Sequence, residues 1–365
     1  MSRYDAAVVG AGPAGCSTAL YLARAGWRVA LVDQAAFPRL KACGEGVMPA
    51  GVEVLRDLGA AELVEGRARR FYGLGYNGPS GGRAVGRFPH GEFGLALRRE
   101  VLDSLLLDRA RAHPGIAVLE RRRLVGLAAG GDGASLSLRG PDGALETLAA
   151  RRVVGADGAS SAVARALGVE RVLPARRRFG VRAHFEGLTG LSELVEVFLR
   201  PRGEVYVAPL RAEGSALVAV LFEQSELPRF SAGAAAAYLE TVAGIPLLAG
   251  ARQATAVRGL GPLGGAARRC EGEGWLLAGD AASSLDPLIG EGIALALQSG
   301  RLAAESLVQG LAPGVYTERR ARLARPKTWL ARGVLALTRR EAAAEAALAV
   351  LRARPQWFTR LLAVR

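Results

Sequence analysis

The chain has 365 residues, enough to bury a large core, so we expect two domains or one large domain with an insertion. Half of the residues are hydrophobic and 22% are charged, a globular composition that excludes a disordered chain. The net charge of +14 is almost entirely arginine, since only residues 41 and 327 are lysine, and we attribute it to a GC-rich coding sequence rather than to a nucleic-acid surface.

The first predicted elements form a βαβ unit between residues 4 and 33. An apolar strand, a glycine turn, a helix and a second strand follow one another there. The turn, GAGPAG, has the spacing G-x-G-x-x-G, which lets a pyrophosphate approach the backbone at the helix N-terminus, and an aspartate after the second strand can accept from a ribose hydroxyl. We therefore expect a dinucleotide at Gly10, Gly12, Pro13, Ala14, Gly15, Asp33 and Gln34.

The next stretch, RLKACGEGVMPAGVEVLRDLG, covers residues 39–59. It is too rich in glycine for a core strand, and its second half has apolar residues at helical spacing. We therefore expect a loop that leads into a helix, and the lysine, cysteine and glutamate within the loop make it a candidate for function.

Further along the chain, a helix is expected over residues 97–112 and short strands over 134–140 and 151–158. Between residues 171 and 258, alternating patterns such as RRFGVRAHF and EVYVAPL predict an antiparallel sheet. A second G-x-G-x-x-G match at Gly259, Gly261 and Gly264 is interpreted as a loop, because Pro262 follows and no helical pattern does. Beyond GWLLAGD the pattern is helical.

Several motifs in order resemble the fingerprints of the FAD-dependent oxidoreductases with the p-hydroxybenzoate hydroxylase-like fold. They are GAGPAG, LRREVLD (97–103), VVGADGASSAV (153–163) and GWLLAGDAASSLDPLIGEGIALAL (274–297). The resemblance implies an α/β fold: a Rossmann-type FAD-binding domain, an inserted antiparallel β-sheet substrate domain and a helical C-terminus. It assigns residues 1–70, 95–170 and 259–310 to the FAD-binding domain, 71–94 and 171–258 to the substrate-binding domain, and 311–365 to a C-terminal helical segment.

More cofactor contacts are implied by the resemblance. The helix that begins near Glu291 would aim its positive end at the flavin, where negative charge develops on reduction. Arg99 matches an arginine at the diphosphate or ribityl region, in preference to Arg98, and Asp157 either contacts the cofactor or supports the fold. Asp280 is implied as the ribityl ligand. The full set implied in these motifs is Arg99, Asp157, Gly279, Asp280, Pro287, Gly290, Gly292 and Ile293.

The pattern K-x-C-G-x-G at residues 41–46 most resembles the geranylgeranyl reductase-like branch, in which such a loop runs along the isoalloxazine. This resemblance implies that Lys41, Cys43 and Gly44 lie at the flavin. Cys43 and Glu45 are the candidates for catalysis, because hydride transfer to an alkene needs a proton partner. The alternative is that Cys43 is a packed residue and Glu45 a solvated loop charge.

The branch implies an FAD-dependent oxidoreductase that reduces a carbon–carbon double bond of a hydrophobic substrate by hydride transfer from reduced flavin. Tyr206 and Phe222 are the expected substrate contacts, and NAD(P)H or another reductant, including an electron-donor protein, would supply electrons. One alternative is a flavin monooxygenase that hydroxylates or epoxidises a secondary metabolite; halogenation is disfavoured because no W-x-W-x-I-P stretch is present. A second alternative is a non-catalytic FAD- or lipid-binding protein.

The three histidines, His90, His113 and His184, are isolated from any metal-ligand spacing and from a serine–acid pair. We therefore expect no metal site and no hydrolase site, and we interpret each histidine as a surface or packed residue.

The tail, residues 339–365, predicts two helices divided at Pro355. The second helix gathers Trp357, Phe358, Leu361 and Leu362, a face that either contacts a membrane interface or caps the protein's own core. The three scattered cysteines indicate a reducing compartment, and we find neither a secretory signal nor an apolar run long enough to span a membrane. We expect a cytoplasmic protein, soluble or peripheral to a membrane, with no nucleic-acid partner.

Overall fold

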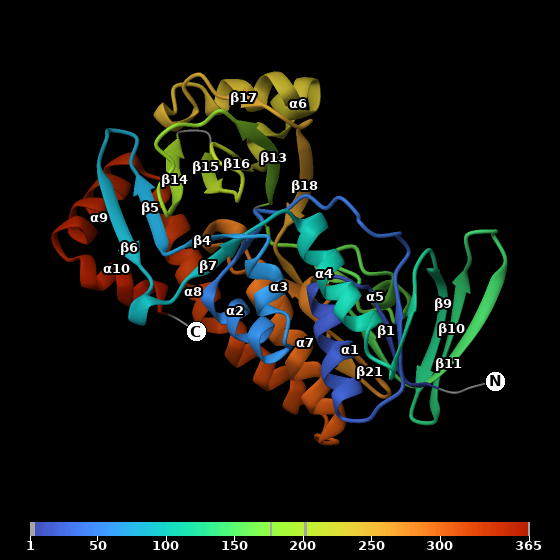
Figure 1. Cartoon of the computed structure of the whole chain (residues 1–365). Coiled ribbons are helices and arrows are strands. Elements are labelled where there is room, and N and C mark those ends of the chain that lie inside the picture. Colours follow the sequence, from blue (N-terminus) through green and yellow to red (C-terminus); the bar gives the residue numbers. More distant parts are fainter. Residues whose placement is uncertain (1–3, 176, 201–202, 364–365) are drawn as a thin grey trace.

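The computed structural model describes residues 4–175, 177–200 and 203–363, and two large sheets organise them (Figure 1). The strands of the first sheet are β1 (Tyr4–Val9), β2 (Val29–Val32), β8 (Ile116–Leu119), β9 (Arg123–Gly130), β10 (Gly133–Arg139), β11 (Leu145–Gly155), β20 (Glu271–Gly272) and β21 (Trp275–Leu277). Strands β21, β11, β1, β2 and β8 are parallel neighbours in that order. Strands β9 and β10 extend from β11 as an antiparallel hairpin.

Helices cover the first sheet, as its sequence requires. Ala6, Ala7 and Val8 of β1 have no exposed surface, which is typical of a parallel strand with packed elements on both of its faces. The helices in this part are α1 (Pro13–Arg24), α4 (Arg99–Arg111), α5 (Ala162–Ala166) and α7 (Gly292–Val308).

Small residues allow α1 and α7 to cross closely. A Cβ on Gly300 would lie 2.3 Å from the carbonyl oxygen of Ala14. Ser17 Oγ donates to the carbonyl of Leu297 at 2.8 Å, and Thr18 Oγ1 lies 3.2 Å from the carbonyl of Gly300. The crossing therefore fixes the first turns of α1, which follow the glycine motif, against the helix that follows the predicted flavin loop.

The second sheet is mostly antiparallel. Its strands are β5 (Gly73–Asn77), β6 (Arg83–Arg87), β13 (Arg178–Glu186), β14 (Val195–Arg200), β15 (Gly203–Pro209), β16 (Ala216–Glu223), β17 (Arg252–Gln253) and β18 (Arg258–Leu263). They are ordered β17, β13, β16, β15, β14, β5, β6, with β18 also paired to β13 and with β14 parallel to β5. Helix α6 (Leu227–Val242) packs on β16, and Figure 1 shows it at the outer side of this sheet.

Two features of this region differ from the sequence interpretation. Helix α6 interrupts the stretch predicted as sheet, because its alanine-rich sequence strongly favours a helix. The second G-x-G-x-x-G match is not a loop: β18 pairs with β13, with Gly259 opposite Val181 and Leu260 opposite Gly180. The glycines and proline of this stretch disfavour a strand locally, but hydrogen bonding to β13 outweighs that preference. Residues 259–263, expected in the FAD-binding domain, thus belong to the second sheet.

Shorter elements connect the two sheets. The strands β3, β7 and β4 form one small sheet, and β12, β19 and β22 form another. Their bounds, with those of the two helices nearby, are β3 (Gly46–Val47), α2 (Pro49–Asp57), α3 (Ala61–Glu65), β4 (Arg69–Phe71), β7 (Gly94–Ala96), β12 (Arg171–Val172), β19 (Gly265–Ala267) and β22 (Ser283–Ser284).

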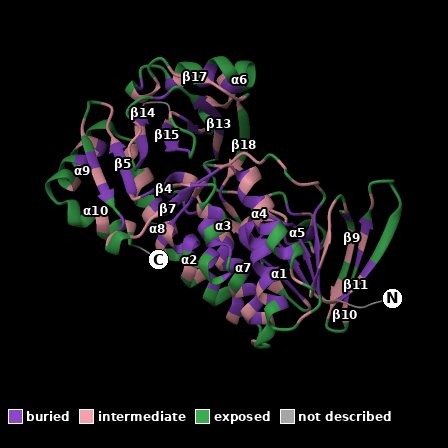
Figure 2. Ribbon diagram, viewed as in Figure 1, coloured by how far each residue is buried: buried purple, intermediate pink, exposed green. Residues whose placement is uncertain are grey.

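The C-terminal segment forms α8 (Val315–Thr338), α9 (Glu341–Ala353) and α10 (Pro355–Leu362). Phe358 is buried against the second sheet, its ring 5.8 Å from that of Tyr76, whereas Trp357 is 46% and Leu361 38% exposed. The predicted apolar face therefore divides into a packed part and an outer part, and Figure 2 shows exposed surface along α9 and α10. Residues 364 and 365 of the predicted tail lie outside the described residues.

In the described ranges, no helix combines the length and the apolar character needed to cross a membrane.

The α1–α7 crossing leads to a stability prediction with a matched control. Gly300→Ala should lower the free energy of unfolding by about 1–3 kcal/mol, because the new methyl group overlaps the Ala14 carbonyl. Gly333→Ala in α8, where the new methyl would meet no atom of the described residues within 4 Å beyond the adjoining backbone of α8, should leave stability unchanged or raise it by about 0.5–1 kcal/mol. Urea unfolding followed by circular dichroism compares the two variants, and equal stabilities would contradict the crossing.

Candidate cofactor and substrate site

A cavity of about 530 Å³ is lined by residues of both sheets. At one end lie the glycine turn before α1 and the end of β2. At the other end lie residues of β13, β15 and β16, most of them apolar, with Tyr206 among them. One continuous space therefore joins a nucleotide-binding turn to an apolar wall.

Two charged residues shape the glycine-turn end of the cavity. The Asp33 carboxylate accepts from the backbone N–H groups of Ala11 (2.7 Å) and Ala35 (2.9 Å), so it fixes the turn itself. Arg39 was not predicted; its guanidinium lies 3.9 Å from Asp33 and 3.4 Å from Asp103. Its place six residues after Asp33, just beyond the second strand of the βαβ unit, is the signal that could have suggested it.

This end of the cavity fits an anionic group. A Cβ on Gly12 would come within 3.3 Å of Arg39 Nη2, so a larger residue there would crowd the space between the backbone and the guanidinium. Arg39 Nε is buried and has no hydrogen-bond partner in the part of the chain that the structure describes. A helix N-terminus, open backbone N–H groups and an incompletely paired arginine together match a diphosphate.

The middle of the cavity is lined by buried and partly buried positive charge. Arg99 Nε and Nη2 donate to the two oxygens of Asp103, each at 2.9 Å. Burial lowers the pKa of Arg99, but Asp103 and Cys43 more than offset this effect and raise it above its usual value. Burial and the nearby Arg99 lower the pKa of Lys41, against the opposing effect of Asp280. These residues supply a positive wall next to the glycine-turn end.

Glu45 is fully enclosed at the junction of the two sheets. It is 1% exposed, and its φ of 57° is in the left-handed region that non-glycine residues rarely adopt. Glu45 Oε2 lies 2.9 Å from Nε2 of His184, and Oε1 lies 3.4 Å from Arg182. The interpretation of Glu45 as a solvated charge is therefore wrong, and His184 is a packed histidine with an acidic partner that sequence reasoning missed.

Ion pairs also hold the predicted flavin loop. Asp286 accepts from the backbone N–H of Leu288 at 3.0 Å and from Arg178 at 2.7 Å, and Arg178 also donates to Glu204. Burial and the nearby Asp286 raise the pKa of Glu204 to about 7, against the lowering effect of Arg178. Just beyond the loop, Glu291 accepts from the buried Lys327 of α8 at 2.7 Å. The loop is thus anchored to the second sheet and to the C-terminal helices.

The two predicted substrate contacts have different positions. Tyr206 lines the cavity and donates to the carbonyl of Leu288 at 2.9 Å. Phe222 does not line the cavity; it stacks on Phe230 of α6, with ring centroids 4.0 Å apart. Successive strand residues face opposite sides, so Leu221 faces the cavity and Phe222 faces away from it. The prediction for Phe222 is wrong for this reason.

The structure brings most of the other predicted residues together. Those that line the cavity are Gly10, Gly12, Pro13, Ala14, Asp33, Gln34, Lys41, Cys43, Gly44, Glu45, Arg99, Asp157, Asp280, Pro287, Gly290, Gly292 and Ile293. Gly15 and Gly279 do not line it, and both sit where a Cβ would collide with α1 or the turn before it. The Asp157 carboxylate accepts from Ser161 and the backbone N–H of Ala162, which supports the start of α5.

In the described residues, no group of three or more histidine, cysteine, aspartate or glutamate side chains could hold a metal ion.

Comparisons with known proteins agree with this geometry. A family described as "FAD binding domain" matches residues 3–314. The chain is 32% identical over 338 residues to menaquinone reductase of Mycolicibacterium smegmatis, covering 85% of this chain and 77% of the relative. It is 30% identical to digeranylgeranylglycerophospholipid reductase 2 of Methanothermobacter thermautotrophicus, covering 87% and 82%. The flavin-dependent halogenase CmlS superposes with a TM-score of 0.83 at 25% identity, covering 98% of this chain and 70% of that chain.

Arg39 provides a test of the anionic end of the cavity. Arg39→Ala should weaken FAD binding about 10- to 100-fold, because a charge-assisted contact of this kind contributes about 1.5–3 kcal/mol. Fluorescence titration of the apoprotein with FAD measures the effect. The matched control is Arg87→Ala, which removes an arginine that is 57% exposed, paired with Glu193 and absent from the cavity wall. Equal affinities of the two variants would show that Arg39 does not contact the cofactor.

Proposed function

The chain belongs to the FAD binding domain family and is an FAD-dependent oxidoreductase, and on that premise we propose that it reduces a carbon–carbon double bond of an elongated hydrophobic substrate. The observation that carries the proposal is the single cavity that joins the nucleotide-binding turn to an apolar wall. When FAD is bound there, it supplies the hydride.

The shape of the apolar end supports a long substrate. A second cavity of about 120 Å³ lies beneath α8, α9 and α10, and it shares Met48, Leu74 and Ile289 with the large cavity. Most of its other lining residues are apolar; the charged ones are Glu291 and Lys327, which form an ion pair with each other. A substrate with an extended apolar chain would occupy both spaces, whereas a small polar substrate would leave the second one unused.

The names of the relatives support the same substrate class. One is named as a reductase of menaquinone and the other as a reductase of a digeranylgeranyl glycerophospholipid, and both names denote lipids with unsaturated isoprenoid chains. We propose an isoprenoid lipid for this chain as well, with NAD(P)H or an electron-donor protein as the source of electrons.

We propose that residues of the loop 41–46 contact the flavin and supply the proton for reduction of the double bond. Lys41, Cys43 and Gly44 line the cavity beside Arg99, and we propose that they contact the flavin. Reduction of an alkene requires a proton as well as a hydride, and Glu45 is the carboxyl residue of this loop among those that line the cavity. Cys43, whose thiol lies close to Arg99, is the second candidate.

Oxygen insertion is the second candidate function, because CmlS shares the fold and is named a flavin-dependent halogenase. Reduction and oxygenation differ in their consumption of oxygen.

The reaction and the role of Cys43 can be tested together. Anaerobic enzyme reduced with dithionite and mixed with a geranylgeranyl phospholipid should reoxidise its flavin and yield a product two hydrogens heavier by mass spectrometry. Cys43→Ser should keep FAD bound but slow this step at least about tenfold, whereas Cys270→Ser, a buried cysteine outside the cavity, should not. Oxygen consumption together with a hydroxylated product would contradict the reductase function. An unchanged rate of flavin reoxidation in Cys43→Ser would show that Cys43 only packs in the loop.

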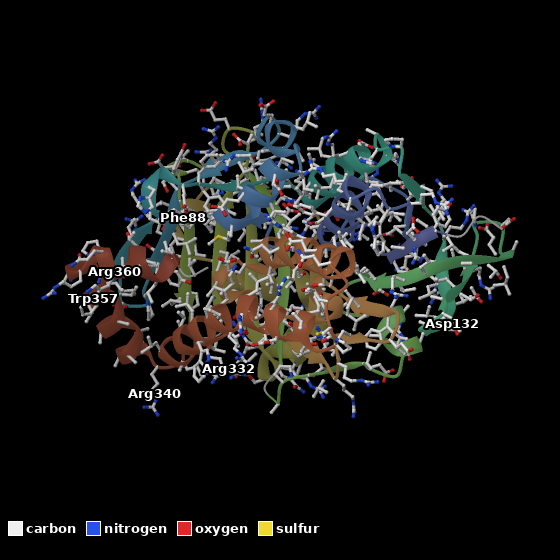
Figure 3. All side chains as sticks on the ribbon, turned by 90° about the horizontal axis from the view of Figure 1, so that it is seen from below. Phe88, Asp132, Arg332, Arg340, Trp357 and Arg360 are labelled. Atoms are coloured by element: carbon white, nitrogen blue, oxygen red, sulfur yellow. The ribbon has the colours of Figure 1, made fainter. Side chains whose placement is uncertain are left out.

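We also propose a peripheral membrane contact through the C-terminal helices. Trp329 of α8 is 72% exposed, and Trp357 and Leu361 of α10 are partly exposed. Arg332 of α8, Arg360 of α10 and Arg340, which lies between α8 and α9, are also in this C-terminal segment (Figure 3). Aromatic side chains beside arginines favour an interface with anionic lipid, and the second cavity lies beneath these helices.

Vesicle co-sedimentation tests the membrane contact. The variant with Trp329→Ser and Trp357→Ser should bind vesicles of phosphatidylcholine and phosphatidylglycerol at least about fivefold less than the wild type, because interfacial tryptophans are removed. Leu145→Ser is the control, since Leu145 is 65% exposed on the distant β10–β11 hairpin. Equal binding of the double variant and the wild type, or binding insensitive to salt, would contradict the contact.

A further inference from the structure

We propose that Glu204 takes up a proton from solvent when the bound flavin is reduced, and that Glu204, Arg178 and Asp286 thereby make the reduction potential of the flavin depend on pH. The inference goes beyond the proposed function, because it concerns the reduction of the cofactor and holds whichever substrate is reduced. The sequence interpretation singled out none of these three residues.

One arginine joins two carboxyl groups next to the predicted flavin loop. Arg178, in β13, donates from Nη1 to Asp286 at 2.7 Å and from Nη2 to Glu204 of β15. The side chains of Arg178 and Glu204 are only 4% and 9% exposed. Asp286 lines the cavity and also accepts from the backbone N–H of Leu288 at 3.0 Å. A single buried positive charge therefore faces two carboxyl groups, one of them at the cavity wall.

The charges of this cluster favour one bound proton. With both carboxyl groups ionised, the cluster has one uncompensated negative charge, which is unfavourable in a buried position. A proton on one carboxyl group brings the net charge to zero. Glu204 is the more buried of the two, because the side chain of Asp286 is 23% exposed. Burial and the nearby Asp286 accordingly raise the pKa of Glu204 to about 7, against the lowering effect of Arg178.

Two tyrosines also lie close enough for the charge of Glu204 to act on them. They are Tyr206, on the same strand, and Tyr76, on β5. Burial raises the pKa of both hydroxyl groups, so both stay protonated near neutral pH. Both hydroxyl groups donate to the carbonyl of Leu288, at 2.9 Å and 3.4 Å. The tyrosines therefore add no charge to the cluster, and they hold the same loop that Asp286 begins.

The strands beside Glu204 place no further charge against it. Its neighbours in the sheet are Leu199 on β14 and Leu221 on β16. Glu223, further along β16, has a side chain that is 40% exposed and pairs with Arg339 at 2.9 Å. In the described residues, the charge state of Glu204 is thus set mainly by its burial, one arginine and one aspartate.

Glu204 is expected to respond to charge in the cavity. When FAD is bound, it supplies a group that becomes more negative on reduction, and Asp286 lies at the cavity wall directly before the predicted flavin loop. Two unit charges about 10 Å apart, at an effective dielectric constant of about 20, shift each other's pKa by about one unit. Negative charge in the cavity therefore favours protonated Glu204, and protonated Glu204 favours reduction of the flavin to the same extent.

The proposed step balances in atoms and charge. Solvent supplies one proton, an O–H bond forms at a carboxylate oxygen of Glu204, and the net charge of the cluster changes from −1 to 0. The two electrons come from the reductant, which is dithionite in the test below, and they remain on the cofactor. On reoxidation the O–H bond of Glu204 breaks and the proton returns to solvent, so the cluster regains its original state.

A merely structural role predicts a different outcome. If Glu204 is ionised at every pH and only ties β15 to β13, Glu204→Gln changes the potential of the flavin by the same amount at every pH. If Glu204 titrates, the wild type and Glu204→Gln have nearly equal potentials below its pKa, where both side chains are neutral. As the pH rises through that pKa, the wild type gains a negative charge and its potential falls below that of the variant.

Redox titration of the holoenzyme with dithionite and an indicator dye tests this difference. The potentials of the wild type and Glu204→Gln should agree at about pH 6 and differ by at least about 30 mV at about pH 9, a tenfold change in the two-electron equilibrium constant. Glu204→Asp, which keeps a carboxyl group, should retain the pH dependence. The matched control is Glu196→Gln: the Glu196 side chain is also 9% exposed, pairs with Arg83 at 2.8 Å and lies outside the cavity wall. Its potential should follow the wild type at every pH.

Infrared spectroscopy of the wild type gives a measurement that needs no folded variant. Reduction of the holoenzyme at about pH 8 should produce the band of a protonated carboxyl group, and in the apoprotein this band should disappear as the pH rises through about 7. A potential difference between the wild type and Glu204→Gln that is the same at every pH would overturn the proposal, as would the absence of the band. A wild type that reduces no double bond would refute the proposed function and leave both titrations unaffected.

Discussion

The contact between Glu45 and strand β13 holds the cavity together, because it links the loop of the first sheet to the second sheet. A buried carboxylate is costly unless opposite charge and donors surround it, and here Arg182 and His184 supply them from β13. The left-handed backbone of Glu45 is a strained conformation that the surrounding contacts must maintain. Loss of either partner would leave an uncompensated charge and would loosen the loop that lines the middle of the cavity.

The parts of this site that follow from local sequence were predictable. A βαβ unit, its glycine turn and the aspartate after its second strand lie within about thirty residues of one another, so their spacing alone specifies a geometry. The loop before α7 was expected from its resemblance to the family's flavin loop. In the structure α7 begins at Gly292, just after Gly290, whose φ of 70° is in the left-handed region that glycine adopts readily. The spacing of such motifs is set by one turn and one helix, not by the rest of the fold.

The contacts between distant segments were not predictable. Glu45 and His184 are 139 residues apart, and nothing near either residue signals the other. Arg178 was part of an alternating strand pattern, yet its partners are Glu204 and Asp286, which lie on other elements. Phe222 was assigned to the cavity side of β16, but it lies on the opposite side. Successive residues of a strand point to opposite faces of the sheet, so the residue type alone does not determine which face a side chain occupies. Such details depend on register and sheet order.

The distribution of charge along the cavity constrains how a substrate can lie in it. Arg39, Arg99 and Lys41 concentrate positive charge toward the glycine turn, and the wall beyond Glu45 is mainly aliphatic. Entry into the aliphatic end stabilises a lipid chain, because it displaces poorly bound water there, whereas a position beside the charged groups is unfavourable because it removes water from them. Under the proposed function, the lipid chain would therefore extend away from the nucleotide-binding turn, and the double bond to be reduced would lie near Glu45 and the flavin loop. In this arrangement, the position of a double bond along the lipid chain, rather than recognition of a polar group, would select the bond that is reduced.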